Sequence, residues 1–346
     1  MASKKRNPVN SLLSSSTKIT KAVPSSVVPS TDVPVPSPKI TEIQENLKCA
    51  PKADGETQKT YSCYSDEALM KLRDLWNARH PQEDMRINAT EPFQIWTALK
   101  KAFQYTCKRE SCWLKQSFVK SGMDKRILNY TFSPEKPEEW NLGGNLDEDS
   151  GSLADPSSDK KQKQKDEDIW LSSLDINKVM HQYEQAHKEF DFIGPSPIDF
   201  DTRLHDGECV WEELCKFDLS YYLDKGKFKI GIIFNLDTHE GGGTHWISMF
   251  IDVRKRFILL FDSNGVPVPK EVHRLVDRIQ KDARELGFGF RILENRVKHQ
   301  RTNTECGMYS LFAIIHLLNE EMTPDQLVGS RIPDKVVFEY RNKYFN

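Results

Sequence analysis

The sequence lacks the features of a protein that spans a membrane or is secreted. None of its apolar runs reaches the length of a transmembrane helix, and residues 1–10 hold no apolar core of the kind found in a secretion signal. Lysine and arginine (49) nearly balance aspartate and glutamate (51), which leaves a formal net charge of −2. We therefore expect no overall field that would draw the protein to nucleic acid or to an acidic membrane surface.

Cysteine is sparse and odd in number. The seven cysteines are scattered along the chain, which argues against a disulfide framework and favours a reducing compartment. Cys107 and Cys112 are close enough to suggest a metal site, but four residues separate them and no matching His or Cys pair follows. The sequence therefore predicts that both pack in a core, and we expect neither a metal nor another cofactor.

What the sequence does contain divides it into segments. Residues 1–63, rich in Ser, Thr, Pro and Val, lack periodic apolar positions and are predicted to be a disordered arm. Residues 64–133 carry helix signals. Residues 134–168 mix Pro, Gly and Ser with dense charge of both signs, which predicts a charged, flexible linker. Residues 169–346 hold the longest series of predicted elements and form a second domain.

The segment 64–133 is predicted to be a small all-helical module. Ser65 and the acidic residues after it mark a helix start. Thr90-Glu91-Pro92 opens a second helix, because proline is tolerated in a first turn. A third helical segment is expected over residues 110–119.

The segment 169–346 is predicted to be an α+β domain, with a central mixed sheet flanked by helices. Short runs rich in Ile and Phe, separated by Gly- or Asp-rich turns, predict strands over 227–234, 246–253, 256–261 and 290–297. Residues 190–200 form an extended, proline-punctuated segment. Helices are expected near 176–183, 211–222, 268–286, 306–318 and the C-terminus.

The most informative stretch is residues 299–318, HQRTNTECGMYSLFAIIHLL. It becomes an almost unbroken apolar run after Cys306, which predicts a helix buried at the centre of the domain. Cys306 would lie in the first turn, where the N–H groups and the helix macrodipole favour a thiolate. Gly307 would let the backbone come close to whatever Cys306 contacts. A buried structural cysteine stays open as the alternative.

A thiol nucleophile needs a base, and the base needs a residue that orients it. His245 follows the Gly241–Gly243 loop and opens a predicted strand, and antiparallel pairing with the next strand would bring Asp262 beside it. Gln300, in the loop before Cys306, is placed to donate to an oxyanion alongside the Cys306 N–H. Spacing alone leaves a cysteine hydrolase and a structural interpretation equally open.

Other residues compete for these roles less well. His299 is nearer to the cysteine in sequence, but adjacency does not bring its ring to the sulfur. Asp252 lies at the far end of its predicted strand. His239-Glu240 matches half of a metalloprotease motif, but the second His is missing and the glycines that follow break a helix.

The chain resembles the SUMO-specific and adenovirus-type cysteine protease clan. The resemblance lies in Thr244-His245-Trp246, the Asp262-Ser263 turn, and Gln300 followed after five residues by Cys306-Gly307. Trp170-Leu171 resembles the Trp-Leu that opens the catalytic domain of that clan and lines its substrate groove. Within that clan, residues 299–307 most resemble the thiol proteases of large cytoplasmic DNA viruses, of the asfarvirus, iridovirus and mimivirus type. Those proteases also carry an N-terminal helical module, and residues 95–103 and 112–118 look like that module. The asfarvirus type has Asn at the position of Asp262, so the acid here follows the SUMO-protease pattern.

The resemblance implies a role for each matching residue. These roles are the base for His245, the orienting acid for Asp262, the oxyanion donor for Gln300, the nucleophile for Cys306, and the walls of a narrow substrate groove for Trp170 and Trp246.

The function that the resemblance implies is that of a thiol protease, an endopeptidase that cleaves after Gly-Gly. Its substrates would be viral structural polyproteins, and it would act in the host cytoplasm or in the virion. The alternative is a protease that removes SUMO or another ubiquitin-like modifier, and a second is an inert binding module of the same fold. A nucleic-acid cofactor has weak support, from Arg296, Lys298 and Arg301. Gly143-Gly144-Asn145 in the predicted linker matches the implied cleavage pattern and suggests self-cleavage after Gly144.

Overall fold

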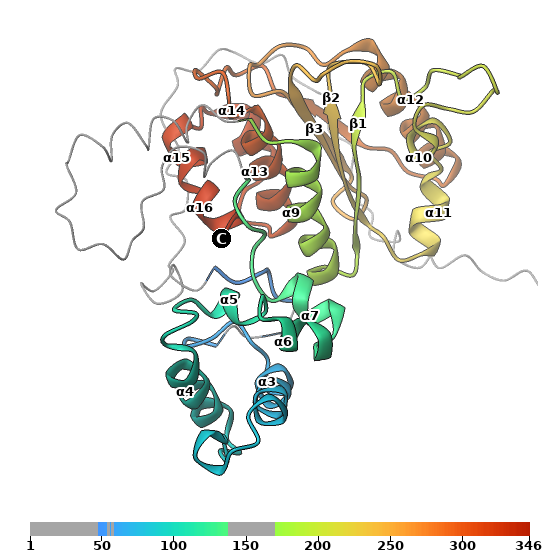
Figure 1. Cartoon of the computed structure of the whole chain (residues 1–346). Helices are drawn as coiled ribbons and strands as arrows, with labels where there is room; N and C mark the ends of the chain where they lie inside the picture. Colours follow the sequence, from blue (N-terminus) through green and yellow to red (C-terminus); the bar gives the residue numbers. More distant parts are fainter. Residues whose placement is uncertain (1–47, 54–55, 57–58, 138–169) are drawn as a thin grey trace, which may run out of the picture.

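The computed structural model describes residues 48–53, 56, 59–137 and 170–346. Most of the predicted arm, most of the predicted linker and the suggested cleavage site at Gly144 lie outside the described residues. The described chain forms a helical module and a larger α+β domain, which occupy the lower and upper parts of Figure 1. No helix among these residues is both long and apolar enough to cross a membrane.

The helical module follows the predicted pattern. Its elements are α3 (Asp66–Arg79), η1 (Glu83–Met85), α4 (Pro92–Phe103), α5 (Glu110–Trp113), α6 (Ser117–Gly122) and α7 (Lys125–Tyr130). Ser65 caps α3 by accepting a hydrogen bond of 3.1 Å from the Ala68 N–H, as its position predicts. The helix expected over 110–119 is instead two short helices, because Gln116 adopts an extended conformation between them.

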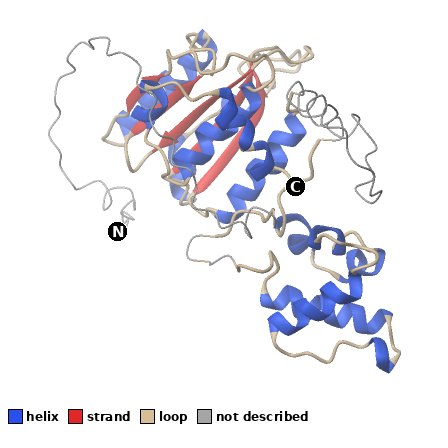
Figure 2. Ribbon diagram, turned by 90° about the vertical axis from the view of Figure 1, so that its left-hand side faces the viewer, coloured by secondary structure: helices blue, strands red, loops and turns tan. Residues whose placement is uncertain are grey.

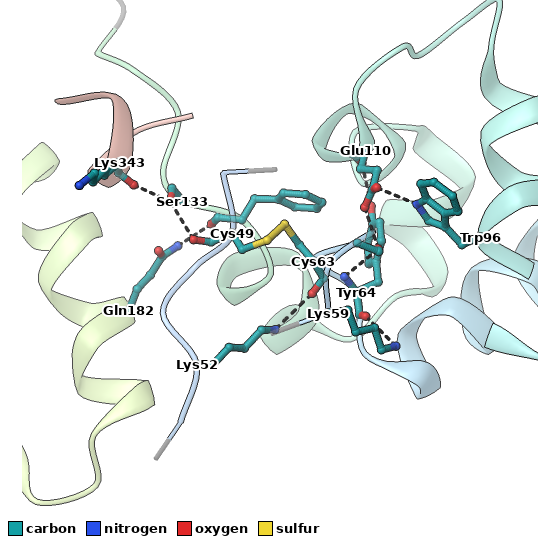
Figure 3. The surroundings of a disulfide bond; sticks show 12 residues. Cys49, Lys52, Lys59, Cys63, Tyr64, Trp96, Glu110, Ser133, Gln182 and Lys343 are labelled. Atoms are coloured by element: carbon teal, nitrogen blue, oxygen red, sulfur yellow. Dashed lines mark hydrogen bonds between the residues drawn. A yellow bond between two sulfur atoms is a disulfide. The ribbon is translucent and has the colours of Figure 1, made fainter. Parts of the chain in front are cut away.

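The module begins earlier than the sequence predicts. Cys49 pairs with Phe132 in an antiparallel bridge. A disulfide joins Cys49 to Cys63 and fastens this start to the rest of the module (Figure 3). The predicted boundary at residue 63 is therefore wrong, and the described part of residues 48–63 belongs to the module. A segment without apolar periodicity can still be held by a single β-bridge and a disulfide, and composition reveals neither.

The cysteines are paired, contrary to the prediction. Disulfides join Cys49 to Cys63, Cys107 to Cys112 and Cys209 to Cys215, and Cys306 is free. The odd number of cysteines led to the wrong prediction, because Cys306 alone is free. The other six pair over separations of only 14, 5 and 6 residues. Cys107 and Cys112 are thus bonded to each other rather than simply packed in a core. The cysteine count no longer supports a reducing compartment.

The α+β domain is built on a five-stranded mixed sheet with the order β1-β2-β3-β4-β5. The strands are β1 (Phe190–Pro197), β2 (Lys229–Asn235), β3 (Trp246–Asp252), β4 (Phe257–Phe261) and β5 (Arg291–Glu294). The outer pairs, β1 with β2 and β4 with β5, are parallel, whereas β3 is antiparallel to both of its neighbours. The predicted fold class is confirmed. Residues 190–200, which were predicted only to be extended, contain strand β1.

Helices cover both faces of this sheet (Figures 1 and 2). They are α9 (Ser173–Ala186), α10 (Glu212–Cys215), α11 (Leu219–Asp224), α12 (Lys270–Glu285), α13 (Cys306–Leu318), α14 (Pro324–Gly329), α15 (Asp334–Glu339) and α16 (Arg341–Tyr344). On β3, Phe250 packs in one apolar core with α9 and α13, while Ile247 and Met249 face the other with α11 and α12. Every residue of α13 is buried, so this helix is the centre of the first core.

The module docks against the α+β domain through specific hydrogen bonds. Gln182 on α9 donates from Nε2 to the carbonyl oxygens of Asn129 (3.0 Å) and Phe132 (2.8 Å). The Ser133 hydroxyl donates to the Lys343 carbonyl on α16 at 3.2 Å (Figure 3). The end of the module therefore lies against both α9 and the last helix of the chain.

Candidate active site

His245 and Asp262 are brought together by the hairpin of β3 and β4. Ser248 on β3 pairs with Phe261 on β4, so the residue before β3 and the residue after β4 lie at the same end of the sheet. The Nε2 atom of His245 is 2.8 Å from Oδ1 of Asp262. The juxtaposition that strand pairing predicted is confirmed.

The turn after β4 holds the Asp262 carboxylate in place. The backbone N–H of Asn264 donates to Oδ1 at 2.8 Å, and Nδ2 of Asn295 donates to the Asp262 carbonyl at 2.6 Å. The amide nitrogen of the Asn264 side chain is also 3.4 Å from Nε2 of His245. Because a carboxylate accepts hydrogen bonds, Asp262 selects the form of His245 in which Nε2 carries a proton.

Cys306 is the first residue of α13 and is 1% exposed. A helix start presents N–H groups and the positive end of the macrodipole to the cysteine sulfur. The next residue, Gly307, lies against a wall made by two other segments. A Cβ added there would be 3.1 Å from Cβ of Leu171 and 3.2 Å from Cδ1 of Trp246. Glycine therefore lets the start of α13 approach this wall closely.

The surroundings of His245 favour its charged form. Burial lowers the pKa of His245, but hydrogen bonds to Asp262 and Cys306, together with the negative charges of both, raise it to about 9. With Nε2 engaged by Asp262, Nδ1 is the ring atom available to the sulfur. A cationic imidazole beside a cysteine stabilises the thiolate, so this arrangement favours an imidazolium–thiolate pair.

His299 has different surroundings. Its Nδ1 accepts a hydrogen bond of 2.9 Å from the Ile332 N–H, and its Nε2 is 3.1 Å from Oδ1 of Asn295. Burial lowers the pKa of His299 to about 4, so the ring is neutral near pH 7. It supports Asn295, which in turn holds the Asp262 turn. Asp252, the other competitor, is the last residue of β3 and lies at the opposite end of the hairpin.

Gln300 is buried in the loop before α13. Its Oε1 accepts a hydrogen bond from Oγ of Ser263 (2.7 Å), and its Nε2 donates to the carbonyl of Thr302 (2.8 Å). Because a carbonyl oxygen only accepts, the bond to Thr302 fixes which end of the amide is nitrogen. The amide nitrogen carries a second N–H, which is the group that an oxyanion would use.

Trp170 and Trp246 line one groove of about 600 Å³. Nε1 of Trp246 donates to the Leu171 carbonyl at 2.9 Å, which fixes its ring in the wall, whereas Trp170 is 42% exposed. The Gly241–Gly243 loop lines the same groove, and this loop leads directly into His245. The groove therefore lies at the same end of the sheet as the reactive side chains, although His245, Asp262, Gln300 and Cys306 are not among the residues that line it.

Sequence reasoning missed several residues of this site. Glu305, directly before Cys306, forms a buried ion pair with Arg341, with Nη2 and Oε1 2.7 Å apart. No local pattern indicates that pair, because the partner lies on the last helix of the chain. Trp211, taken from the sequence as a helix start, also lines the groove. The only sequence signal for Asn264 is its place in the turn after β4.

This arrangement has the parts needed for acyl transfer. A thiolate can attack a carbonyl, an imidazolium can protonate the leaving group, and N–H donors can stabilise an oxyanion. Among the residues that the structure describes, no three His, Cys, Asp or Glu side chains are grouped to hold a metal ion.

Comparison with known proteins agrees with this geometry. Residues 227–346 match the C-terminal catalytic domain of the Ulp1 protease family. The chain is 31% identical over 180 residues to a thiol protease of Acanthamoeba polyphaga mimivirus, a match that covers 51% of this chain and 56% of that protein. It is 31% identical over 185 residues to the SUMO-1 cysteine protease of African swine fever virus, isolate Pig/Kenya/KEN-50/1950. That match covers 51% of this chain and 67% of the relative.

The fold has a counterpart among solved structures. The crystal structure of the African swine fever virus protease matches with a TM-score of 0.58 at 22% sequence identity, over 88% of this chain and 99% of that one. The shared fold therefore extends beyond the α+β domain into the helical module. The resemblance predicted from the sequence motifs is confirmed. On these matches, the chain belongs to the Ulp1 protease family of cysteine peptidases.

Proposed function

We propose that this chain is a cysteine endopeptidase in which Cys306 is the nucleophile, His245 the base and Asp262 the residue that orients the base. The observation that carries the proposal is the 2.8 Å contact between His245 and Asp262, in a site where Cys306 lies near enough to the same ring to raise its pKa. A structural cysteine needs no such partner. An inert binding module has no use for an oriented, charged histidine beside its free thiol. A structural cysteine and an inert module therefore both leave the His245–Asp262 contact unexplained.

In the acylation step the Cys306 thiolate attacks the carbonyl carbon of the scissile peptide bond. A C–S bond forms, and the carbonyl π electrons move to oxygen. The His245 imidazolium then transfers its Nδ1 proton to the leaving nitrogen, the C–N bond breaks, and the amine departs. A thioester to Cys306 remains, and His245 is neutral. Asp262 holds the ring throughout.

In the deacylation step His245 takes a proton from water, and the resulting hydroxide attacks the thioester carbon. The C–S bond breaks, the acid product leaves, and the imidazolium–thiolate pair is restored. Each step passes through an oxyanion. The second N–H of the Gln300 amide and the backbone N–H of Cys306 are the donors that we assign to it.

The proposed specificity is cleavage after Gly-Gly. Its support is the resemblance of the site motifs to a clan whose groove admits only glycine at the two positions before the scissile bond. Trp170 and Trp246, the two residues that correspond to the walls of that groove, line one groove here. The exposed ring of Trp170 would cover the substrate from the other side of the groove.

The substrates that we propose are viral structural polyproteins, cleaved in the host cytoplasm or in the virion. The support is that both relatives are named as proteases and come from viruses, a mimivirus and African swine fever virus. The chain spans 56% of the mimivirus relative, so the proposal of these substrates rests only on the part of that protein which the chain matches. No cofactor is required by the proposed chemistry.

A deconjugating protease is the second candidate. It is favoured by the name of the African swine fever virus relative, a SUMO-1 cysteine protease. The chemistry at Cys306 would be the same, because a modifier that ends in Gly-Gly presents the same backbone to the groove. The difference lies in whether a surface outside the groove binds a folded modifier.

One experiment tests the proposal and separates the candidates. The purified chain is incubated with a Gly-Gly-X peptide library, with a matched Gly-Ala-X library as the control, and with a SUMO precursor. Cleavage of Gly-Gly-X alone supports the endopeptidase. Efficient cleavage of the SUMO precursor with poor peptide cleavage supports the deconjugase, and comparable cleavage of both libraries contradicts the proposed specificity.

A further inference from the structure

We propose that the Arg341–Glu305 ion pair positions Cys306 and cancels the charge beside it, and that the helical module holds Arg341 in place. The module would thus act as an activator within the same chain. This inference rests on the proposed role of Cys306 as the nucleophile. It assigns a positioning function to residues that do not touch the substrate.

The ion pair has a fixed geometry. Nη2 of Arg341 is 2.7 Å from Oε1 of Glu305, and Nε is 3.1 Å from Oε2. The guanidinium thus contacts both carboxylate oxygens, an arrangement that restricts both side chains. Both are almost fully buried, with side-chain exposures of 3% and 2%.

Glu305 is the residue from which α13 starts. Its carbonyl accepts the first backbone hydrogen bond of the helix, from the Tyr309 N–H at 2.8 Å, and its own N-cap side chain makes no hydrogen bond to the helix backbone. The side chain is held by α16 instead. The ion pair therefore sets the path of the backbone directly before Cys306.

The same pair decides the charge beside the nucleophile. A lone carboxylate next to Cys306 would disfavour a thiolate by like-charge repulsion. Burial raises the pKa of Glu305 and the Arg341 guanidinium opposes this, while the Asp334 carboxylate adds to the rise. With Arg341 in place, the carboxylate is compensated. Without it, a buried charge or a buried acid would remain one residue from the sulfur.

Arg341 is the first residue of α16, and α16 is held by the module. The single O–H of Ser133 is shared between two acceptors, the Lys343 carbonyl on α16 (3.2 Å) and the Cys49 carbonyl (3.1 Å). The latter belongs to the disulfide-linked start of the module, as Figure 3 shows. Ser133 therefore bridges the disulfide-bonded segment and the last helix.

The chain end adds a second attachment. The backbone N–H of Asn346 donates to the Pro134 carbonyl at 2.7 Å, and the N–H of Lys136 donates to the Asn346 carbonyl at 3.3 Å. The segment after the module and the segment after α16 thus pair along their backbones. A series of contacts leads from the module through α16 to Arg341, Glu305 and Cys306.

The electrostatic part is tested with charge variants. Arg341→Met should slow alkylation of Cys306 by iodoacetamide at pH 7 roughly tenfold or more, because it leaves the Glu305 carboxylate alone. Glu305→Gln combined with Arg341→Met should recover most of the rate, since no lone charge remains. Arg341→Lys, which keeps the charge, should lose at most about threefold. Circular dichroism confirms that each variant is folded.

The coupling to the module is tested with a matched pair of variants. Ser133→Ala removes the shared hydroxyl bridge and should lower kcat roughly two- to tenfold with little change in KM, the range expected for the loss of a hydrogen bond. Ser121→Ala is the control, because its exposed hydroxyl bonds only within α6, to the Ser117 carbonyl. In the Glu305→Gln/Arg341→Met background, Ser133→Ala should cause no further loss.

Each outcome decides a part of the proposal. Wild-type alkylation in Arg341→Met, or equal alkylation in the single and double variants, overturns the electrostatic role. If Arg341→Met does not fold, a loss of much more than threefold in Arg341→Lys overturns the electrostatic role, because that variant keeps the charge, and Ser133→Ala still tests the link to the module. Equal kcat in Ser133→Ala and Ser121→Ala overturns the link to the module. Activity that survives Cys306→Ala would instead reject the proposed nucleophile, so the two failures can be told apart.

Discussion

Nε2 of His245 lies 2.8 Å from Oδ1 of Asp262, and this contact joins the residue before β3 to the residue after β4. It leaves the other ring nitrogen available to Cys306, and it raises the pKa of the imidazole. Asn264 and Asn295 both donate hydrogen bonds to Asp262. The turn after β4 therefore fixes the carboxylate that orients the His245 ring. The proposed mechanism depends on this relationship.

Two replacements of Asp262 separate the effect of its charge from its effect on the orientation of the His245 ring. Asp262→Asn should lower kcat about tenfold, because the amide oxygen can still accept the Nε2–H bond while the charge is lost. Asp262→Ala should lower kcat about a hundredfold or more, within the range that general acid–base catalysis contributes. Steady-state kinetics on a Gly-Gly-X peptide measure both. Equal losses would mean that charge, and not orientation, is what Asp262 supplies.

The pH dependence follows from the raised pKa of His245. Its value of about 9, against an ordinary 6.5, keeps the imidazolium present at neutral pH. Since the protonated ring must supply the leaving amine with a proton, kcat/KM should fall as the pH rises through about 9. The stability that the charged ring contributes is complete below about 6.5 and is lost over the same upper range.

Replacing Asp262 should move the upper pH limit of activity. In Asp262→Ala the pKa of His245 should drop, because one of its stabilising charges is gone, and the basic limb of the kcat/KM profile should shift to lower pH. An unchanged basic limb in Asp262→Ala would show that the limb belongs to another group.

The two histidines near the site should behave differently. His245→Ala should abolish turnover, because the proton-transfer group is removed. His299→Ala should keep most of the turnover number but lower the melting temperature, since the His299 ring is buried with both nitrogens engaged. Peptide kinetics and thermal unfolding measure the pair. A dead His299→Ala that is fully folded, beside an active His245→Ala, would mean that the base is misassigned.

Removing the proposed oxyanion donor tests the transition state. Gln300→Ala should lower kcat roughly a hundredfold or more with little effect on KM, the usual result of losing one such donor. Gln300→Glu is the shape-matched control and should be at least as damaging, because a carboxylate cannot donate. A turnover number that stays at the wild-type level in Gln300→Ala removes Gln300 from the mechanism.

Much of this architecture could be predicted from the sequence, because local signals carried it. The apolar run after Cys306 gave α13, and the Ile- and Phe-rich runs with Gly- or Asp-rich turns gave β2 to β5. Strand pairing across a short hairpin then fixed His245 against Asp262 without knowledge of any distant contact. Those features depend on periodicity and near neighbours.

The rest depends on contacts between residues distant in the sequence. The Arg341–Glu305 pair joins residues 36 apart, and the bridge from Cys49 to Phe132 spans most of the module. The disulfides were missed for another reason. The number of cysteines does not show which one stays free and which ones pair. Composition placed the start of the module at residue 64 and could not show that a segment bridged to Phe132 and disulfide-bonded to Cys63 precedes it.

The most direct test of the central claim follows Cys306 itself. Wild-type chain and Cys306→Ala are each incubated with a Gly-Gly-X peptide and with an electrophilic Gly-Gly probe, and the products and the labelled residue are identified by mass spectrometry. The proposed mechanism predicts cleavage after Gly-Gly and a single labelled residue, Cys306, in the wild type, with neither event in Cys306→Ala although that variant is folded. Cleavage by folded Cys306→Ala at the wild-type rate would contradict it.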